Sequence, residues 1–158
     1  HLTRIHDHEG LCKYKKGGTP CAFVNIKDLI LLNEFPEKWR DGIYRESVKN
    51  IQKYLLSYDL STADYPRQNP SPNKHWMNFA HFRSYQSSVF QGAEALVMSG
   101  IRNHKTLKKA LKVVGSKCVD EKTWKTNYIQ RKFPLQLEKG LSPWLTVSGL
   151  RIIKAFST

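Results

Sequence analysis

One amphipathic stripe constrains the fold of this chain more than any other feature of the sequence. Over residues 43–58, apolar side chains recur at intervals of four, three, four and three residues. Those residues are Tyr44, Val48, Ile51, Leu55 and Tyr58. This spacing places them on one side of an α-helix about four turns long. Because such a helix is stable mainly when its apolar side is packed, the stripe predicts a helix within a larger domain.

Glycines mark the expected ends of two further helices. A long helix is predicted over residues 74–99, with its aromatic stripe in the core and Gly100 just beyond its end. A shorter helix is predicted over residues 104–114, with Asn103 as its N-cap and Gly115 as its stop. Glycine is common after a helix because it adopts the left-handed conformation without steric cost.

Three more segments complete the expected secondary structure. A helix is predicted over residues 119–131, ending before a proline. Another is predicted from Pro143 to Phe156, because Ser142 followed by Pro143 combines an N-cap with a favoured first helical residue. The apolar segment 23–32 is open to two interpretations, either a buried strand or a short helix over 26–33 capped by Asn25.

Helical patterns dominate and almost no period-two alternation is present, so the predicted fold class is mainly α. At 158 residues the chain is expected to form a single compact domain of about five or six helices with an irregular N-terminal segment. Residues 1–22 are that segment, with a small metal or disulfide loop as one interpretation, and residues 23–158 are the helical domain with a basic C-terminal third. The apolar run 29–32 is far shorter than the roughly 20 residues of a membrane span, so none is expected.

Basic charge is concentrated in the C-terminal third. The whole chain carries a net charge of +13, and residues 101–158 contain 13 lysines and arginines against 3 acidic residues. A surface whose charges are mainly positive attracts polyanions and raises their local concentration. We therefore expect a non-enzymatic protein that binds RNA or DNA, with a larger ribonucleoprotein or chromatin assembly as one setting. An acidic protein partner, or a basic surface that only aids solubility, is the alternative.

The predicted binding surface lies between residues 105 and 132. Its basic side chains are expected to contact phosphates and displace condensed counterions. They are Lys105, Lys108, Lys109, Lys112, Lys117, Lys122, Lys125, Arg131 and Lys132. The segment resembles a helix-turn-helix motif in outline, with apolar residues before the turn at Gly115 and Trp124 nine residues after it. Trp124 and Tyr128 are predicted to be core residues, with base stacking as the alternative.

A cluster of metal-capable residues occurs in the N-terminal segment. His6, His8, Cys12 and Cys21 follow the spacing H-x-H-x3-C-x8-C. Imidazole and thiolate are the preferred ligands of zinc, so these residues are candidate ligands of a structural zinc ion. A disulfide between Cys12 and Cys21, or four unligated side chains, would account for the same residues.

An enzymatic alternative depends on a short resemblance. The stretch Phe82 to Ser87 (FRSYQS), followed by Gly115 to Trp124, resembles the later part of the bacterial flagellar-type glucosaminidases, which are lysozyme-like peptidoglycan hydrolases. The resemblance implies a glycoside hydrolase in which Glu46 protonates the leaving oxygen. The simpler interpretation of Glu46 is a surface residue paired with nearby lysines on its own helix.

The cellular setting is suggested by three weak features. Three cysteines are too few for a disulfide scaffold, and the chain contains no Asn-x-Ser/Thr acceptor. The chain begins at His1 and shows no leader pattern, which indicates a mature or trimmed N-terminus. Together these features favour an intracellular or organellar setting.

Overall fold

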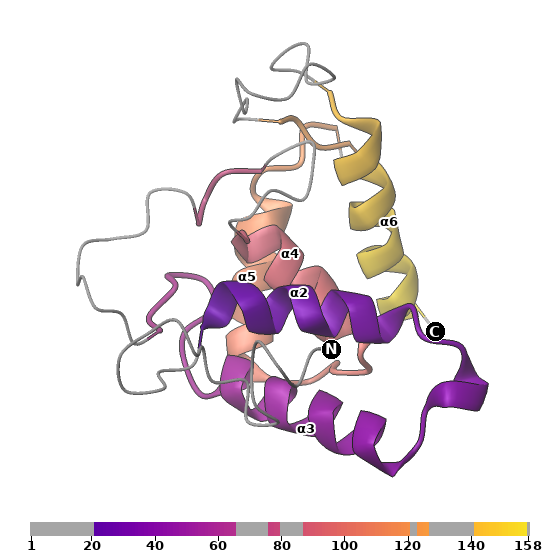
Figure 1. Cartoon of the computed structure of the whole chain (residues 1–158). Helices are drawn as coiled ribbons and strands as arrows, with labels where there is room; N and C mark the ends of the chain where they lie inside the picture. Colours follow the sequence, from indigo (N-terminus) through magenta and orange to yellow (C-terminus); the bar gives the residue numbers. More distant parts are fainter. Residues whose placement is uncertain (1–20, 66–75, 80–86, 121–122, 127–140, 158) are drawn as a thin grey trace, which may run out of the picture.

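The computed structural model describes residues 21–65, 76–79, 87–120, 123–126 and 141–157 (Figure 1). Within these ranges it contains one short 3-10 helix, Glu37–Trp39, and five α-helices. The α-helices are α2 (Ala22–Asn33), α3 (Gly42–Leu56), α4 (Val89–Met98), α5 (Lys105–Gly115) and α6 (Pro143–Ser157). The prediction of a mainly α fold is therefore confirmed.

Helix α4 is the centre of the fold. It packs against α2, α5 and α6, while α3 packs against α2 and runs back along it (Figure 1). Eight of the ten residues of α4 are buried, which is why this helix carries almost no charge. The amphipathic stripe of α3 faces inward, with Ile51 and Leu55 buried.

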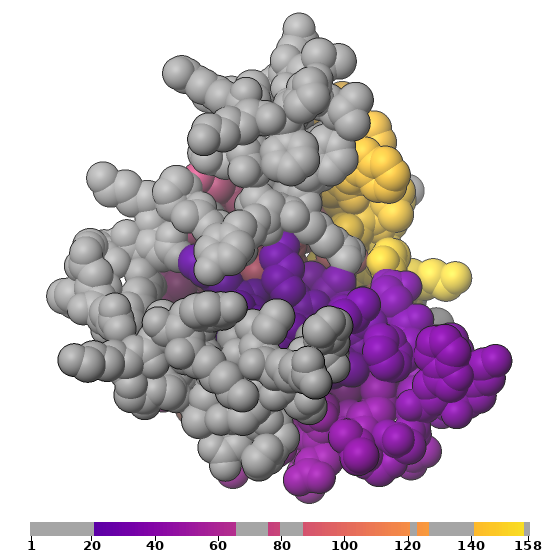
Figure 2. All heavy atoms as spheres, viewed as in Figure 1, coloured from indigo at the N-terminus to yellow at the C-terminus, as the bar shows by residue number. Residues whose placement is uncertain are grey.

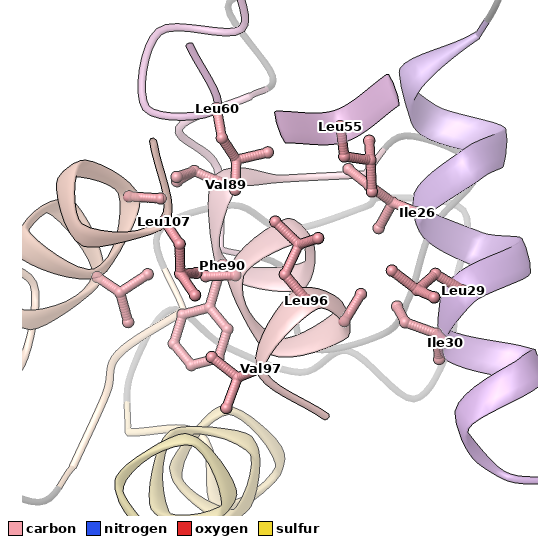
Figure 3. Close-up of a cluster of buried hydrophobic side chains, with 14 of the residues drawn as sticks. Ile26, Leu29, Ile30, Leu55, Leu60, Val89, Phe90, Leu96, Val97 and Leu107 are labelled. Carbon is pink, nitrogen blue, oxygen red and sulfur yellow. The ribbon is translucent and has the colours of Figure 1, made fainter. Parts of the chain in front are cut away.

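The core consists of side chains that converge on α4 from both sides. Figure 3 shows Leu96 pointing toward Ile26 and Leu29 of α2, and Phe90 lying toward Leu107 of α5. All five of these side chains are at most 1% exposed. Burying aliphatic and aromatic side chains this completely contributes about 1.5–3 kcal/mol for each one relative to an exposed position.

The ambiguous segment 23–32 is helical. Its buried residues include Ile26, Leu29 and Ile30, a spacing of three and four residues that suits a helix and not a strand. Asn25 does not cap this helix, as the sequence suggested, because the helix already begins at Ala22. The Asn25 side chain instead donates a hydrogen bond to the Cys21 carbonyl from within the first turn.

The single long helix predicted over residues 74–99 is wrong. Ser88 has an extended backbone and its hydroxyl accepts a hydrogen bond from the Gln91 amide, so the helix begins only at Val89. Trp76 and Phe79 lie outside it and are still buried, as expected for core aromatics. The Trp76 indole donates to the Leu60 carbonyl, so a loop delivers this ring to the core.

Gly100 ends α4 as predicted. Its φ of +94° lies in the left-handed region. The Gly100 amide donates to the Val97 carbonyl and the Ile101 amide donates to the Leu96 carbonyl, which is the hydrogen-bond pattern of a Schellman motif. These two bonds satisfy carbonyls that the end of the helix would otherwise leave unpaired.

Two predictions after α4 need correction. The N-cap of α5 is His104 rather than Asn103, because the His104 ring nitrogen Nδ1 accepts from the Thr106 amide at 3.3 Å. The helix predicted over 119–131 is absent from the described residues 118–120 and 123–126. They form isolated antiparallel bridges instead, between Cys118 and Trp124 and between Lys125 and Leu141.

The start of α6 matches its sequence signal. Ser142 precedes Pro143, and the Ser142 hydroxyl accepts from the Leu145 amide at 3.3 Å. Arg151 then ties α6 to the rest of the fold through ion pairs with Glu34 at 2.9 Å and with the buried Glu94 of α4 at 3.5 Å. Pairing is what makes a buried carboxylate tolerable in this position.

Candidate nucleic-acid interface

Helix α5 has one apolar side and one basic side. Thr106, Leu107, Ala110 and Val114 are buried against the core. The four lysines of the helix are all exposed. They are Lys105, Lys108, Lys109 and Lys112. At about 100° of rotation per residue they fall within an arc of roughly 100° opposite the buried residues. The helix therefore holds four ammonium groups on one solvent-facing side.

Lys109 differs from the other three lysines because it has a partner. Its Nζ lies 2.8 Å from Oδ2 of Asp59, at the start of the turn after α3. This hydrogen bond, together with one from Ser61, lowers the pKa of the Asp59 carboxyl below its usual 3.8. Lys109 thus serves to attach the 59–65 turn to α5, and its charge is partly neutralised within the protein.

Substituting Asp59 with asparagine tests this assignment. A carboxyl whose pKa is lowered by folding stabilises the protein above its unfolded pKa and loses that effect as the pH falls through the folded value. We expect D59N to reduce the free energy of unfolding by up to about 1 kcal/mol at pH 7, because the pair is near the surface. The difference in unfolding free energy between D59N and the original protein should become smaller below about pH 4, as measured by urea unfolding.

Asp64 provides the matched control for this experiment. It is exposed on the same turn, and the substitution D64N removes the same charge. We expect its free energy of unfolding at pH 7 to stay within about 0.5 kcal/mol of that of the original protein, as is usual for an exposed position. A deficit for D59N that persists unchanged at pH 2.5 would show that the ion pair with Lys109 does not contribute as described.

Lys105, Lys108 and Lys112 have no acidic partner in the part of the chain that the structure describes. The same holds for Lys117, just after α5, and for Lys125. These five ammonium groups face solvent. An anionic ligand can thus bind these ammonium groups without displacing an acidic side chain among the described residues.

The structure does not place every predicted residue on one helical surface. Lys125 is exposed between the buried Trp124 and Thr126, on the bridge that pairs with Leu141. The second helix that the helix-turn-helix resemblance requires is therefore missing from the described residues, and that expectation is wrong. Lys122, Arg131 and Lys132 lie outside the described residues, as does Tyr128.

Trp124 is a core residue, as predicted. It is 3% exposed, its indole Nε1 donates to the Val114 carbonyl at 2.9 Å, and its ring meets Phe90 edge-on. A ring held in this way cannot stack on a base. Among the described residues of this region, the exposed lysines remain as candidate contacts for a nucleic acid.

Asp59 is the residue of this surface that sequence reasoning missed. It lies 50 positions before Lys109, and nothing in the local pattern of either residue signals that they meet. Only the tertiary fold, which places the turn after α3 next to α5, brings the two side chains together.

The candidate zinc ligands are largely beyond what the structure describes. His6, His8 and Cys12 lie outside the described residues. Cys21 is described as a free, half-buried thiol immediately before α2. Among the described residues, no group of three or more histidine, cysteine, aspartate or glutamate side chains is placed to hold a metal ion.

Glu46 is exposed on α3. A cleft of about 310 Å³ lies beside α3, and Arg45 and Val48 are among the residues that line it. Glu46 is not one of the lining residues. A glycosidase acid is normally enclosed so that its carboxyl stays protonated. Residues 82–86 of the FRSYQS stretch lie outside the described residues, and Ser87 is buried, with its hydroxyl donating to the Phe23 carbonyl.

None of the helices described combines the length and the apolar character needed to cross a membrane. Comparison of the chain with protein-family models, curated proteins and solved structures gave no significant match. The function must therefore be inferred from the chemistry and placement of this chain's own residues.

Proposed function

We propose that this protein binds RNA or DNA through the phosphate backbone, using the exposed lysines of α5. The observation that carries the proposal is the grouping of Lys105, Lys108 and Lys112 on one side of a helix whose other side is anchored in the core. The helix fixes the backbone positions of these three lysines, so this segment need not fold when phosphates bind. The net charge of +10 over residues 101–158 would steer a polyanion toward this part of the chain.

The expected recognition is of the backbone and independent of base sequence. Lysine is a compact charge on a flexible stem, which suits contact with phosphates and lacks the rigid donor fork of arginine. The aromatic residue nearest to this surface in sequence, Trp124, is buried. Affinity should therefore come mainly from counterion release and should depend steeply on salt concentration.

The test is a titration of the purified protein with labelled 20-nucleotide RNA and DNA, single-stranded and duplex, between about 50 and 300 mM salt. We expect micromolar or tighter binding at low salt, with a steep negative slope of log affinity against log salt and little dependence on sequence. Absence of binding at 50 mM salt would overturn the proposal and would favour an acidic protein as the partner of α5.

A further inference from the structure

The cleft beside α3 brings cationic and polar side chains together. Its volume of about 310 Å³ lies at the lower end of the range of small-molecule sites, about 300–1,000 Å³. Arg45, Val48, Lys49 and Gln52 line it from α3, together with the last residues of α2 and α4. At about 100° of rotation per residue, these four positions of α3 fall within an arc of roughly 100°. Figure 2 shows the purple side chains of α2, the 3-10 helix and α3 forming the lower right part of the molecular surface.

Two cations of this cleft are available to a ligand. Arg45 and Lys49 lie one turn apart on α3, and neither belongs to an ion pair among the described residues. The Arg45 Nε donates to the Arg40 carbonyl at 3.2 Å, which orients the guanidinium and leaves its two terminal nitrogens for a ligand. Arg40 also lines the cleft, but its charge is partly neutralised by Glu37 at 3.0 Å. None of the described lining residues is acidic.

The neutral side chains of the cleft offer hydrogen-bond acceptors. The Gln52 amide nitrogen donates to the Ser99 carbonyl at 2.9 Å, and the Asn33 amide nitrogen donates to the Ala95 carbonyl at 2.9 Å. A backbone carbonyl only accepts, so these bonds fix the orientation of both amide groups. The side-chain oxygens of Asn33 and Gln52 are thus left as acceptors without a partner among the described residues. The same two bonds cover carbonyls at the end of α4, where partial negative charge would otherwise repel an anion.

This set of groups indicates the chemistry of a ligand. A phosphate monoester carries close to two negative charges at pH 7, which matches two cations better than a singly charged carboxylate does. The guanidinium of Arg45 can bind two phosphate oxygens at once. The two amide oxygens require N–H donors on the rest of the ligand, and Val48 and Met98 supply apolar surface for a ring.

We propose that this cleft binds a small phosphate monoester whose ring system carries N–H donors, which is the chemistry of a nucleoside monophosphate. Arg45 and Lys49 hold the phosphate, and Asn33 and Gln52 accept hydrogen bonds from the ring. The site is separate from the lysines of α5 and does not rest on the proposed function. The backbone of a nucleic acid consists of phosphodiesters, which carry one charge each.

The test is isothermal titration calorimetry of the complete chain with adenosine monophosphate (AMP) at pH 7. We expect one saturable site with a Kd below about 1 mM. The variant R45Q/K49Q should weaken AMP binding by about tenfold or more, because it removes both cations from the cleft. Both side chains are exposed, so the variant should remain folded, which circular dichroism checks.

The matched control is K108Q/K112Q, which removes the same charge from the exposed side of α5. It should leave AMP binding within about twofold and should weaken RNA and DNA binding. The two proposals can therefore fail separately. Loss of nucleic-acid binding in the salt titration, with AMP binding retained, would overturn only the proposed function.

Three related ligands test each part of the recognition. Adenosine lacks the phosphate, the methyl ester of AMP is a diester with a single charge, and the monophosphate of purine riboside lacks the amino group of adenine. We expect each to bind about fivefold or more weakly than AMP.

Four outcomes would overturn the proposal. The first is no saturable binding of AMP up to about 5 mM. The second is AMP binding that R45Q/K49Q leaves unchanged, and the third is equal weakening by K108Q/K112Q. The fourth is equal affinity for inorganic phosphate and AMP, which would show that the cleft selects only an anion and that its amide oxygens do not contact a ligand.

Discussion

Replacing Gly149 with alanine is expected to destabilise the protein by about 2 kcal/mol, even though alanine favours a helix more than glycine does. Gly149 lies within α6, directly against the ring of Trp124. A Cβ at this position would lie closer to three ring atoms than real Cβ atoms approach their neighbours. The ring has little freedom to move away, because Phe90 lies against it and its Nε1 is bonded to Val114.

Gly115 supplies the control for this substitution. It is the last residue of α5, and a Cβ built there meets nothing within 4 Å. We expect G115A to change the free energy of unfolding by less than about 1 kcal/mol, and in the stabilising direction, because only helix propensity changes. Chemical denaturation followed by circular dichroism measures both variants under the same conditions.

A double-mutant cycle identifies the cause of the Gly149 effect. In the background W124L the large ring is gone, so adding the alanine should cost much less than it does in the original protein. A cost for G149A that is the same in both backgrounds would show that the contact between α6 and Trp124 is not its origin.

Reversing the charge of Lys105, Lys108 and Lys112 together is expected to abolish most nucleic-acid binding. The triple glutamate variant should bind all sequences more weakly and lower the salt slope by about three, roughly one unit for each phosphate that the helix no longer neutralises. Lys109 is left unchanged, because its ammonium already pairs with Asp59 and its removal would also disturb the turn after α3. Anisotropy titrations between about 50 and 300 mM salt give both quantities.

The matched control is K38E/K49E/K53E. These three lysines are exposed on the 3-10 helix and α3, and their reversal changes the net charge by the same amount. If the control lowers the salt slope as much as the α5 variant, binding reflects total charge and not the α5 surface. Circular dichroism checks that both variants remain folded, as expected for exposed positions.

Local sequence signals identified α3, α5 and α6 correctly. The stripe over 43–58, the Ser142–Pro143 start and the Gly100 stop each act within a few residues, so tertiary contacts are not needed to recognise them. The lysines of α5 were also predictable as one surface, because helical periodicity alone fixes their common side. Fold class and the candidate binding surface followed from these local rules.

The two wrong helix predictions, over 74–99 and 119–131, have one physical cause. Aromatic residues spaced to suit a helix also suit a core reached from a loop, and Trp76 and Phe79 use the second solution. Trp124 likewise reaches the core from a bridged segment rather than from a helix. Burial of a large ring gains similar free energy from either backbone, so an aromatic pattern cannot decide between them.

The sequence by itself therefore determined the extents of α3, α5 and α6 to within about two residues and the apolar sides of α3 and α5, because those features depend on neighbouring residues. The tertiary structure decided that Lys109 meets Asp59, that Gly149 must be small, and that the apolar residues of α6 divide between a buried and an exposed side. These facts depend on residues far apart in the chain that meet only when the helices pack around α4.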